Sequence, residues 1–218
     1  MVESSHQQLR EVPIKQLGNQ DYWQDVANLV GGQAEQLAVQ VRREGWPFRL
    51  TWMKGFIWPL ASLSGGEFRR FLTNPLSVYT RLISCPVVDP QQFRFFVGPS
   101  ARLAGLFGDK KLADPALPNR CMTASDHDLA RSLVARGEFE ALLALLPPRA
   151  WLGLQTSSMT LSETRTYPAG VGFLVLQLGQ HQEPARMAAL LDGLVSLLQA
   201  MVAIGAIEAG DPDQQPWV

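Results

Sequence analysis

Hydrophobic positions near the end of the chain predict a strand followed by a long helix. Residues 171–178 form a short and almost continuous apolar run, which is typical of a buried strand. Residues 184–204 are mostly apolar, and the polar residues Asp192, Ser196 and Gln199 fall three and four positions apart on one helical face. We therefore predict a C-terminal helix that buries the rest of its surface against the protein.

The same apolar segment raises the question of a membrane span. Residues 187–207 are about as long as a span must be, and they contain few strongly polar residues. An aspartate near the centre of a span, here Asp192, costs about 2.5–3.5 kcal/mol on insertion scales. No cluster of basic residues flanks the segment. We interpret it as the core helix of a soluble protein and predict no membrane span.

Shorter patterns predict strands in the rest of the chain. Large apolar side chains at every second position predict a strand over residues 46–52, and Pro47 favours a place at the edge of a sheet. Residues 77–88 and 91–98 are predicted to pair as a hairpin, because Asp89 and Pro90 between them favour a turn. Further strands are predicted over residues 120–124, 151–156 and 159–166.

Helical spacing occurs in two other regions. Apolar residues from Trp23 to Val41 recur as on an amphipathic helix, which Gly31 and Gly32 interrupt. Residues 126–136 and 138–146 are predicted as two successive helices. Ser125 is the predicted cap of the first of these two, with an acidic residue three positions later.

The order of these elements predicts an α+β fold. Strands in runs and helices in runs favour an antiparallel sheet of five or more strands, packed on one face by helices that include the long C-terminal one. A chain of 218 residues suits one large domain with a single core. We divide it into a Trp-rich N-terminal part (1–76), an α+β core (77–208) and a tail (209–218).

Charge and cysteine content narrow the class of protein. Nineteen basic and twenty acidic residues leave a net charge of −1, so no overall field would attract nucleic acid or anionic lipid. The two cysteines match neither a disulfide framework nor a zinc site, and they favour a reducing compartment. The first residues lack the basic and apolar stretches of a secretion signal. We predict a cytoplasmic protein that does not bind nucleic acid.

Motifs that carry chemistry are few. The run Asp126-His127-Asp128 begins a predicted helix, where consecutive side chains point in different directions and do not converge on a metal. Residues 63–67 are similar to the signature loop of ABC-transporter ATPases, but the phosphate-binding loop that must face it is missing. We predict no catalytic, metal-binding or cofactor-binding residue, although residues distant in sequence can still converge.

Part of the chain resembles a family of uncharacterised bacterial domains. The similar features are a Tyr79-Thr80-Arg81 strand, a turn and strand with Asp89 and Phe93, and a closing apolar helix that ends at Ile204-Gly205. Residues 113–118 depart from the family pattern, with leucine and proline where the family has phenylalanine and aspartate. The resemblance covers about residues 79–205, and it implies a fold without implying an activity.

Four of the six tryptophans lie between Trp23 and Trp58, together with Phe48 and Phe56, and three interpretations of these aromatic residues stay open. They cap the core, they contact another protein, or they line an apolar pocket between sheet and helix. We favour a non-catalytic interaction or scaffold module that binds another protein or a second copy of itself as a homodimer. The alternative is a binding domain for a small apolar or amphipathic ligand. The predicted interaction surface comprises Trp46, Phe48, Trp52 and Trp58.

Overall fold

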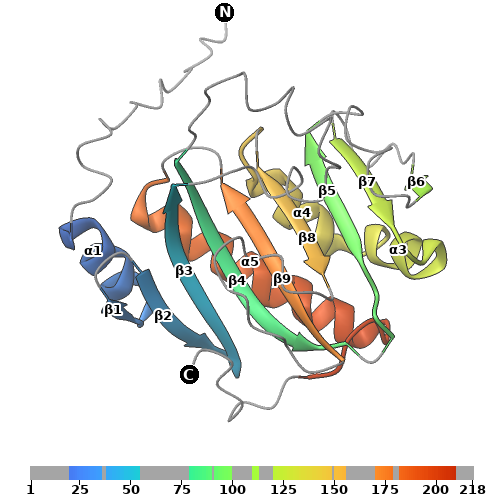
Figure 1. The fold of residues 1–218 in the computed structure, drawn as a ribbon, viewed down its shortest axis with the longest axis horizontal. Helices are drawn as coiled ribbons and strands as arrows, with labels where there is room; N and C mark the ends of the chain where they lie inside the picture. The colour runs from blue at the N-terminus through green and yellow to red at the C-terminus, as the bar shows by residue number, and fades with distance from the viewer. Residues whose placement is uncertain are drawn as a thin grey trace, which may run out of the picture.

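The computed structural model contains nine strands and four helices within its described residues, which confirms the predicted α+β fold (Figure 1). The described residues are 20–35, 38–54, 79–89, 91–99, 110–112, 120–148, 150–155, 170–178 and 182–209. The helices are α1 (Gln20–Val30), α3 (His127–Val134), α4 (Gly137–Leu145) and α5 (Pro184–Ala203). The strands are β1 (Gln33–Glu35), β2 (Ala38–Arg43), β3 (Trp46–Lys54), β4 (Tyr79–Val88), β5 (Phe95–Pro99), β6 (Lys110–Leu112), β7 (Arg120–Ala124), β8 (Trp151–Gln155) and β9 (Val171–Leu178).

All nine strands belong to one antiparallel sheet. Their spatial order is β1-β2-β3-β4-β9-β8-β5-β7-β6, so the strands nearest the C-terminus lie in the middle. Helix α5 runs behind the central strands in Figure 1, with α1 against it on one side and α4 on the other. The helices therefore form a layer on one face of the sheet, as the apolar stripe of α5 predicts.

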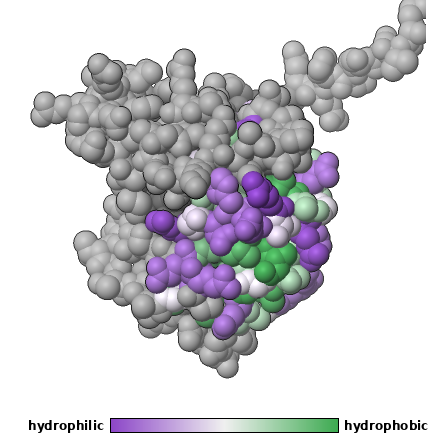
Figure 2. Space-filling view, turned by 90° about the vertical axis from the view of Figure 1, so that its right-hand side faces the viewer, coloured by the Kyte–Doolittle hydropathy of each residue, from purple (hydrophilic) through white to green (hydrophobic). Residues whose placement is uncertain are grey.

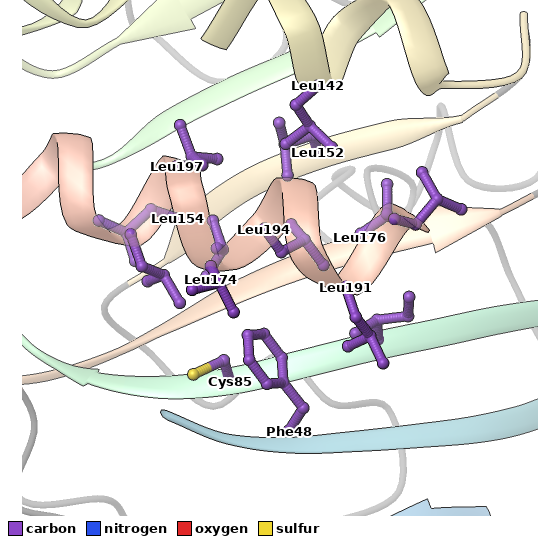
Figure 3. Close-up of a cluster of buried hydrophobic side chains, with 14 of the residues drawn as sticks. Phe48, Cys85, Leu142, Leu152, Leu154, Leu174, Leu176, Leu191, Leu194 and Leu197 are labelled. Atoms are coloured by element: carbon purple, nitrogen blue, oxygen red, sulfur yellow. The ribbon is translucent and has the colours of Figure 1, made fainter. Parts of the chain in front are cut away.

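The hydrophobic core lies between the sheet and α5. Strand register aligns one buried apolar residue from each of six neighbouring strands in a row, and each is at most 1% exposed. Figure 3 shows side chains of β3, β4, β8 and β9 directed toward Leu191, Leu194 and Leu197 of α5. The row is Leu50, Ile83, Leu176, Leu152, Val97 and Met122.

The polar face of α5 contacts the end of β2 and the turn that follows it. Arg43 donates from Nε and Nη2 to Asp192 Oδ1 at 3.0 and 2.6 Å. Gln199 Nε2 donates to Glu44 Oε2 at 2.5 Å. By length and composition alone α5 could cross a membrane. In the structure it packs against the sheet, α1 and α4.

The other face of the central strands carries aromatic side chains that alternate with the core row. Phe96 and Trp151 pack with ring centroids 5.1 Å apart, and the ring of Trp151 lies over Gly98. Phe96, Trp151 and Phe173 are all buried, at 7–9% exposure. Both faces of this part of the sheet are therefore covered, and the described helices lie on only one of them.

The N-terminal helix is shorter than its apolar pattern predicts. It ends at Val30, where Gly31 adopts a φ of +71° and the Gly32 N–H donates to the Ala27 carbonyl at 2.9 Å. This is a Schellman ending, which a glycine in the left-handed region terminates at low cost. The predicted helix from Trp23 to Val41 is therefore wrong beyond Val30, because Ala34 lies on β1 and Val41 on β2.

Two predictions about strand pairing also differ from the structure. Strand β3 is not an edge strand, because it pairs with both β2 and β4. Pro47 is tolerated because pairing with β4 begins only at Arg49. The predicted hairpin of β4 and β5 is wrong as well, because β9 and β8 lie between them. The segment after β4 therefore passes the ends of β9 and β8 before β5 begins at Phe95.

The start of α3 is capped one residue later than predicted. Asp126 Oδ1 accepts hydrogen bonds from the N–H groups of Asp128 and Leu129 at 2.8 and 3.0 Å. Ser125 Oγ instead accepts from the Arg94 N–H, which ties this turn to the start of β5. The predicted strand over residues 159–166 lies outside the described residues.

Candidate functional site

The residues of the predicted interaction surface separate into two groups. Trp46 and Phe48 lie on β3 and are 6% and 2% exposed, as part of the hydrophobic core. In the structure these two side chains pack in the core, which is one of the three interpretations that the sequence leaves open. The side chain of Trp52 and the whole of Trp58 lie outside the described residues.

Trp58 lies in the segment of the chain that connects β3 to β4. Lys54, the last residue of β3, pairs directly with Tyr79, the first residue of β4. Residues 55–78 therefore leave and re-enter the sheet at adjacent positions. Hairpin connections usually have about 2–5 residues, so the segment 55–78 is long for a connection between two paired strands. Sequence reasoning missed this feature, because the pairing of the two strands is not visible in their own patterns.

The space that the ligand hypothesis requires, between sheet and α5, is occupied by side chains. Leu174 and Leu176 of the sheet and Leu191 and Leu194 of α5 point toward one another in Figure 3, and each is at most 2% exposed. Helices α4 and α5 also pack closely, since a Cβ added to Gly193 would lie 2.9 Å from Leu142 Cδ1. These contacts are those of a close-packed core.

The end of β4 is the junction of several segments, with Asp89 at its centre. This aspartate is fully buried, its Oδ1 accepts from the Phe93 N–H at 2.9 Å, and its own N–H donates to the Gly170 carbonyl at 2.7 Å. One residue earlier, the Val88 carbonyl accepts from the Glu208 N–H at 2.9 Å. Asp89 therefore ties the turn after β4 to the residue before β9, and Val88 beside it ties β4 to the segment after α5.

Burial gives Asp89 an unusual titration. Loss of hydration raises the pKa of the carboxyl above its ordinary value, and hydrogen bonds from the N–H groups of Phe93 and Gln92 oppose that rise only in part. A folded-state pKa above the unfolded one means that the folded protein binds the proton more tightly. Ionisation of Asp89 therefore lowers the free energy of unfolding as pH rises.

We expect Asp89→Asn to reveal this titration in the pH dependence of stability. Asparagine keeps an oxygen acceptor for the Phe93 N–H but does not ionise. As pH rises from about 4, near the unfolded pKa, through the folded pKa, the variant should gain stability relative to the unmodified protein. Urea unfolding midpoints measured at several pH values between about 4 and 7 give the difference. A difference that does not change with pH would contradict the expectation.

Two arginines close the C-terminal end of α4. Arg120 on β7 donates from Nη2 to the carbonyls of Leu146 and Pro147 at 3.2 and 2.9 Å, and from Nη1 to that of Ala150 at 3.2 Å. Arg186 Nη2 on α5 donates to the Leu145 carbonyl at 2.8 Å. Burial lowers the pKa of Arg120. Because helix ends leave carbonyls without partners and carry partial negative charge, both arginines have a structural role here.

The two cysteines have different environments. Cys85 on β4 is fully buried and faces α5 in Figure 3, and its burial raises the pKa of the thiol far above its usual range. Cys121 on β7 is half-buried. A nucleophilic thiolate needs a lowered pKa and access to solvent, and Cys85 has neither.

We expect the native protein to be alkylated at Cys121 and protected at Cys85. The buried thiol should react with iodoacetamide only after denaturation, which peptide mass spectrometry can establish at both sites. Cys121→Ser provides the control, since this variant should take up no label until it unfolds. Rapid labelling of Cys85 in the folded protein would show that the core opens more readily than its packing indicates.

The candidate metal ligands do not converge. Within the described ranges, no group of three or more His, Cys, Asp or Glu side chains is placed to hold a metal ion. Asp126 caps α3, and Asp128 lies 3.4 Å from Arg131 Nη1 in an exposed ion pair. His127 lies at the start of the same helix, whereas His6 and His181 lie outside the described residues.

Figure 2 shows hydrophobic side chains among hydrophilic ones on the side of the molecule that carries β7 and α3. On α3 and α4, Leu129 and Leu143 are half-buried and pack against the core, and Glu138 and Glu140 are exposed. These leucines therefore form the margin of the core. Among the large hydrophobic side chains that the structure describes, Leu29 on α1 is the exposed one, at 55%.

Comparison with known proteins adds a structural likeness. No protein-family model matches the chain, and no curated protein matches it. The chain is similar to the crystal structure of the mycobacterial trehalose monomycolate transport factor A, TtfA, with a TM-score of 0.48 and 8% sequence identity. The alignment covers 92% of this chain and 99% of that one. A likeness this distant carries no argument about function.

Proposed function

We propose that this protein is a non-catalytic interaction module that associates with a second copy of itself. The observation that carries the proposal is the close packing between the sheet and α5, where the alternative function would need room for a ligand. Buried leucines from both layers meet there, which favours the interaction module over the ligand-binding domain. We also propose that the protein is cytoplasmic.

Trp58 is the aromatic residue that we propose for the contact. Trp46 and Phe48 pack in the core. The interface that we propose therefore uses an aromatic residue that comes later in the sequence. Trp58 belongs to the connection whose two ends, Lys54 and Tyr79, are paired neighbours in the sheet. Tryptophan is enriched among the residues that contribute most to protein interfaces.

Light scattering coupled to size exclusion tests the proposal on the full chain. At micromolar concentration we expect a mass twice that of the 24.1 kDa chain. Trp58→Ser should shift the mass to that of a single chain and leave the thermal unfolding curve of the dissociated protein cooperative. A single-chain mass for the unmodified protein at every concentration would overturn the proposal.

Leu29→Ser is the control for the loss of a large apolar side chain. Leu29 is exposed on α1, away from the β3–β4 connection along the chain. Its replacement should leave the mass of the assembly unchanged. If Leu29→Ser dissociates the assembly and Trp58→Ser does not, then self-association is correct but its contact lies on α1.

A further inference from the structure

We draw no further inference here: the strongest candidate, the face of the central strands opposite α5 on which Phe96, Trp151 and Phe173 are buried, carries nothing because the described part of the structure does not show what covers it.

Discussion

Leu194→Ala should lower the thermal stability of the protein by a large margin. Leu194 lies midway along α5, is 1% exposed and points into the leucine cluster between helix and sheet (Figure 3). Truncating a buried leucine to alanine costs about 2–5 kcal/mol, because the lost contacts are only partly replaced when the site relaxes. For a protein of this size that corresponds to a decrease in Tm of about 4–20 °C.

The control for this experiment is the same substitution at an exposed leucine. Leu29 on α1 is 55% exposed, so Leu29→Ala removes an equal volume without leaving a cavity in the core. Surface substitutions of this kind usually change stability by less than about 0.5 kcal/mol. Equal melting curves for Leu194→Ala and the unmodified protein would show that α5 does not contribute to stability as its burial predicts.

Gly98→Ala should be the other strongly destabilising substitution, although it adds only one methyl group. A Cβ at Gly98 would lie 1.9 Å from Cε3 and 2.0 Å from Cζ3 of Trp151. The indole ring must therefore move, and it packs against Phe96 with ring centroids 5.1 Å apart. Overpacking of this kind typically costs about 1–3 kcal/mol. Urea unfolding followed by circular dichroism measures the change.

Gly137→Ala separates this clash from the general effect of replacing a glycine. Gly137 begins α4, and a Cβ added there would meet no neighbouring atom within 4 Å. We expect this control to be neutral or to stabilise by up to about 1 kcal/mol, because alanine restricts the unfolded chain and favours helix. In a double-mutant cycle, Gly98→Ala should cost less when Trp151→Leu is already present than it costs in the unmodified protein, since the smaller side chain leaves room for the methyl group.

Elements whose signal lies within their own residues could be predicted from the sequence. The extents of α5, β8 and β9 were predicted within one residue at each end, because apolar residues dominate these segments and polar, proline or glycine residues mark their ends. The segment after Val30 could not be assigned in the same way. Val39 and Val41 fit a strand period as well as a continued helical stripe, and the left-handed conformation of Gly31 decides between them.

Strand pairing depends on partners that are distant in sequence. The neighbour of Cys85 on β4 is Leu174 on β9, and nothing near β4 in the sequence indicates that choice. The prediction of a β4–β5 hairpin failed for this reason, since a turn signal shows that the chain bends but not which strands then pair. Two later strands, β9 and β8, occupy the positions between β4 and β5.

The candidate site could also be predicted only where its signal is local in the sequence. Alternation along residues 46–52 indicates that Trp46 and Phe48 share one face of a strand, and both are indeed buried on β3. Whether that face meets solvent, a partner or a helix depends on α5, more than a hundred residues later. The junction at the end of β4 was not predicted either, because the hydrogen bonds of Asp89 with Gly170 and of Val88 with Glu208 join segments that are distant in sequence. Trp52 and Trp58 stay predictions.

The placement of β8 and β9 between β4 and β5 affects the order in which the protein can fold during synthesis. Strands β3, β4, β5 and β7 leave the ribosome before the two strands that join them into one sheet. Until residue 178 has emerged, the inner edges of β4 and β5 lack their final partners, and such unpaired edges promote aggregation. Contacts of long sequence separation also form slowly. Folding of the nascent chain therefore depends most on β8 and β9, because these two strands complete the centre of the sheet.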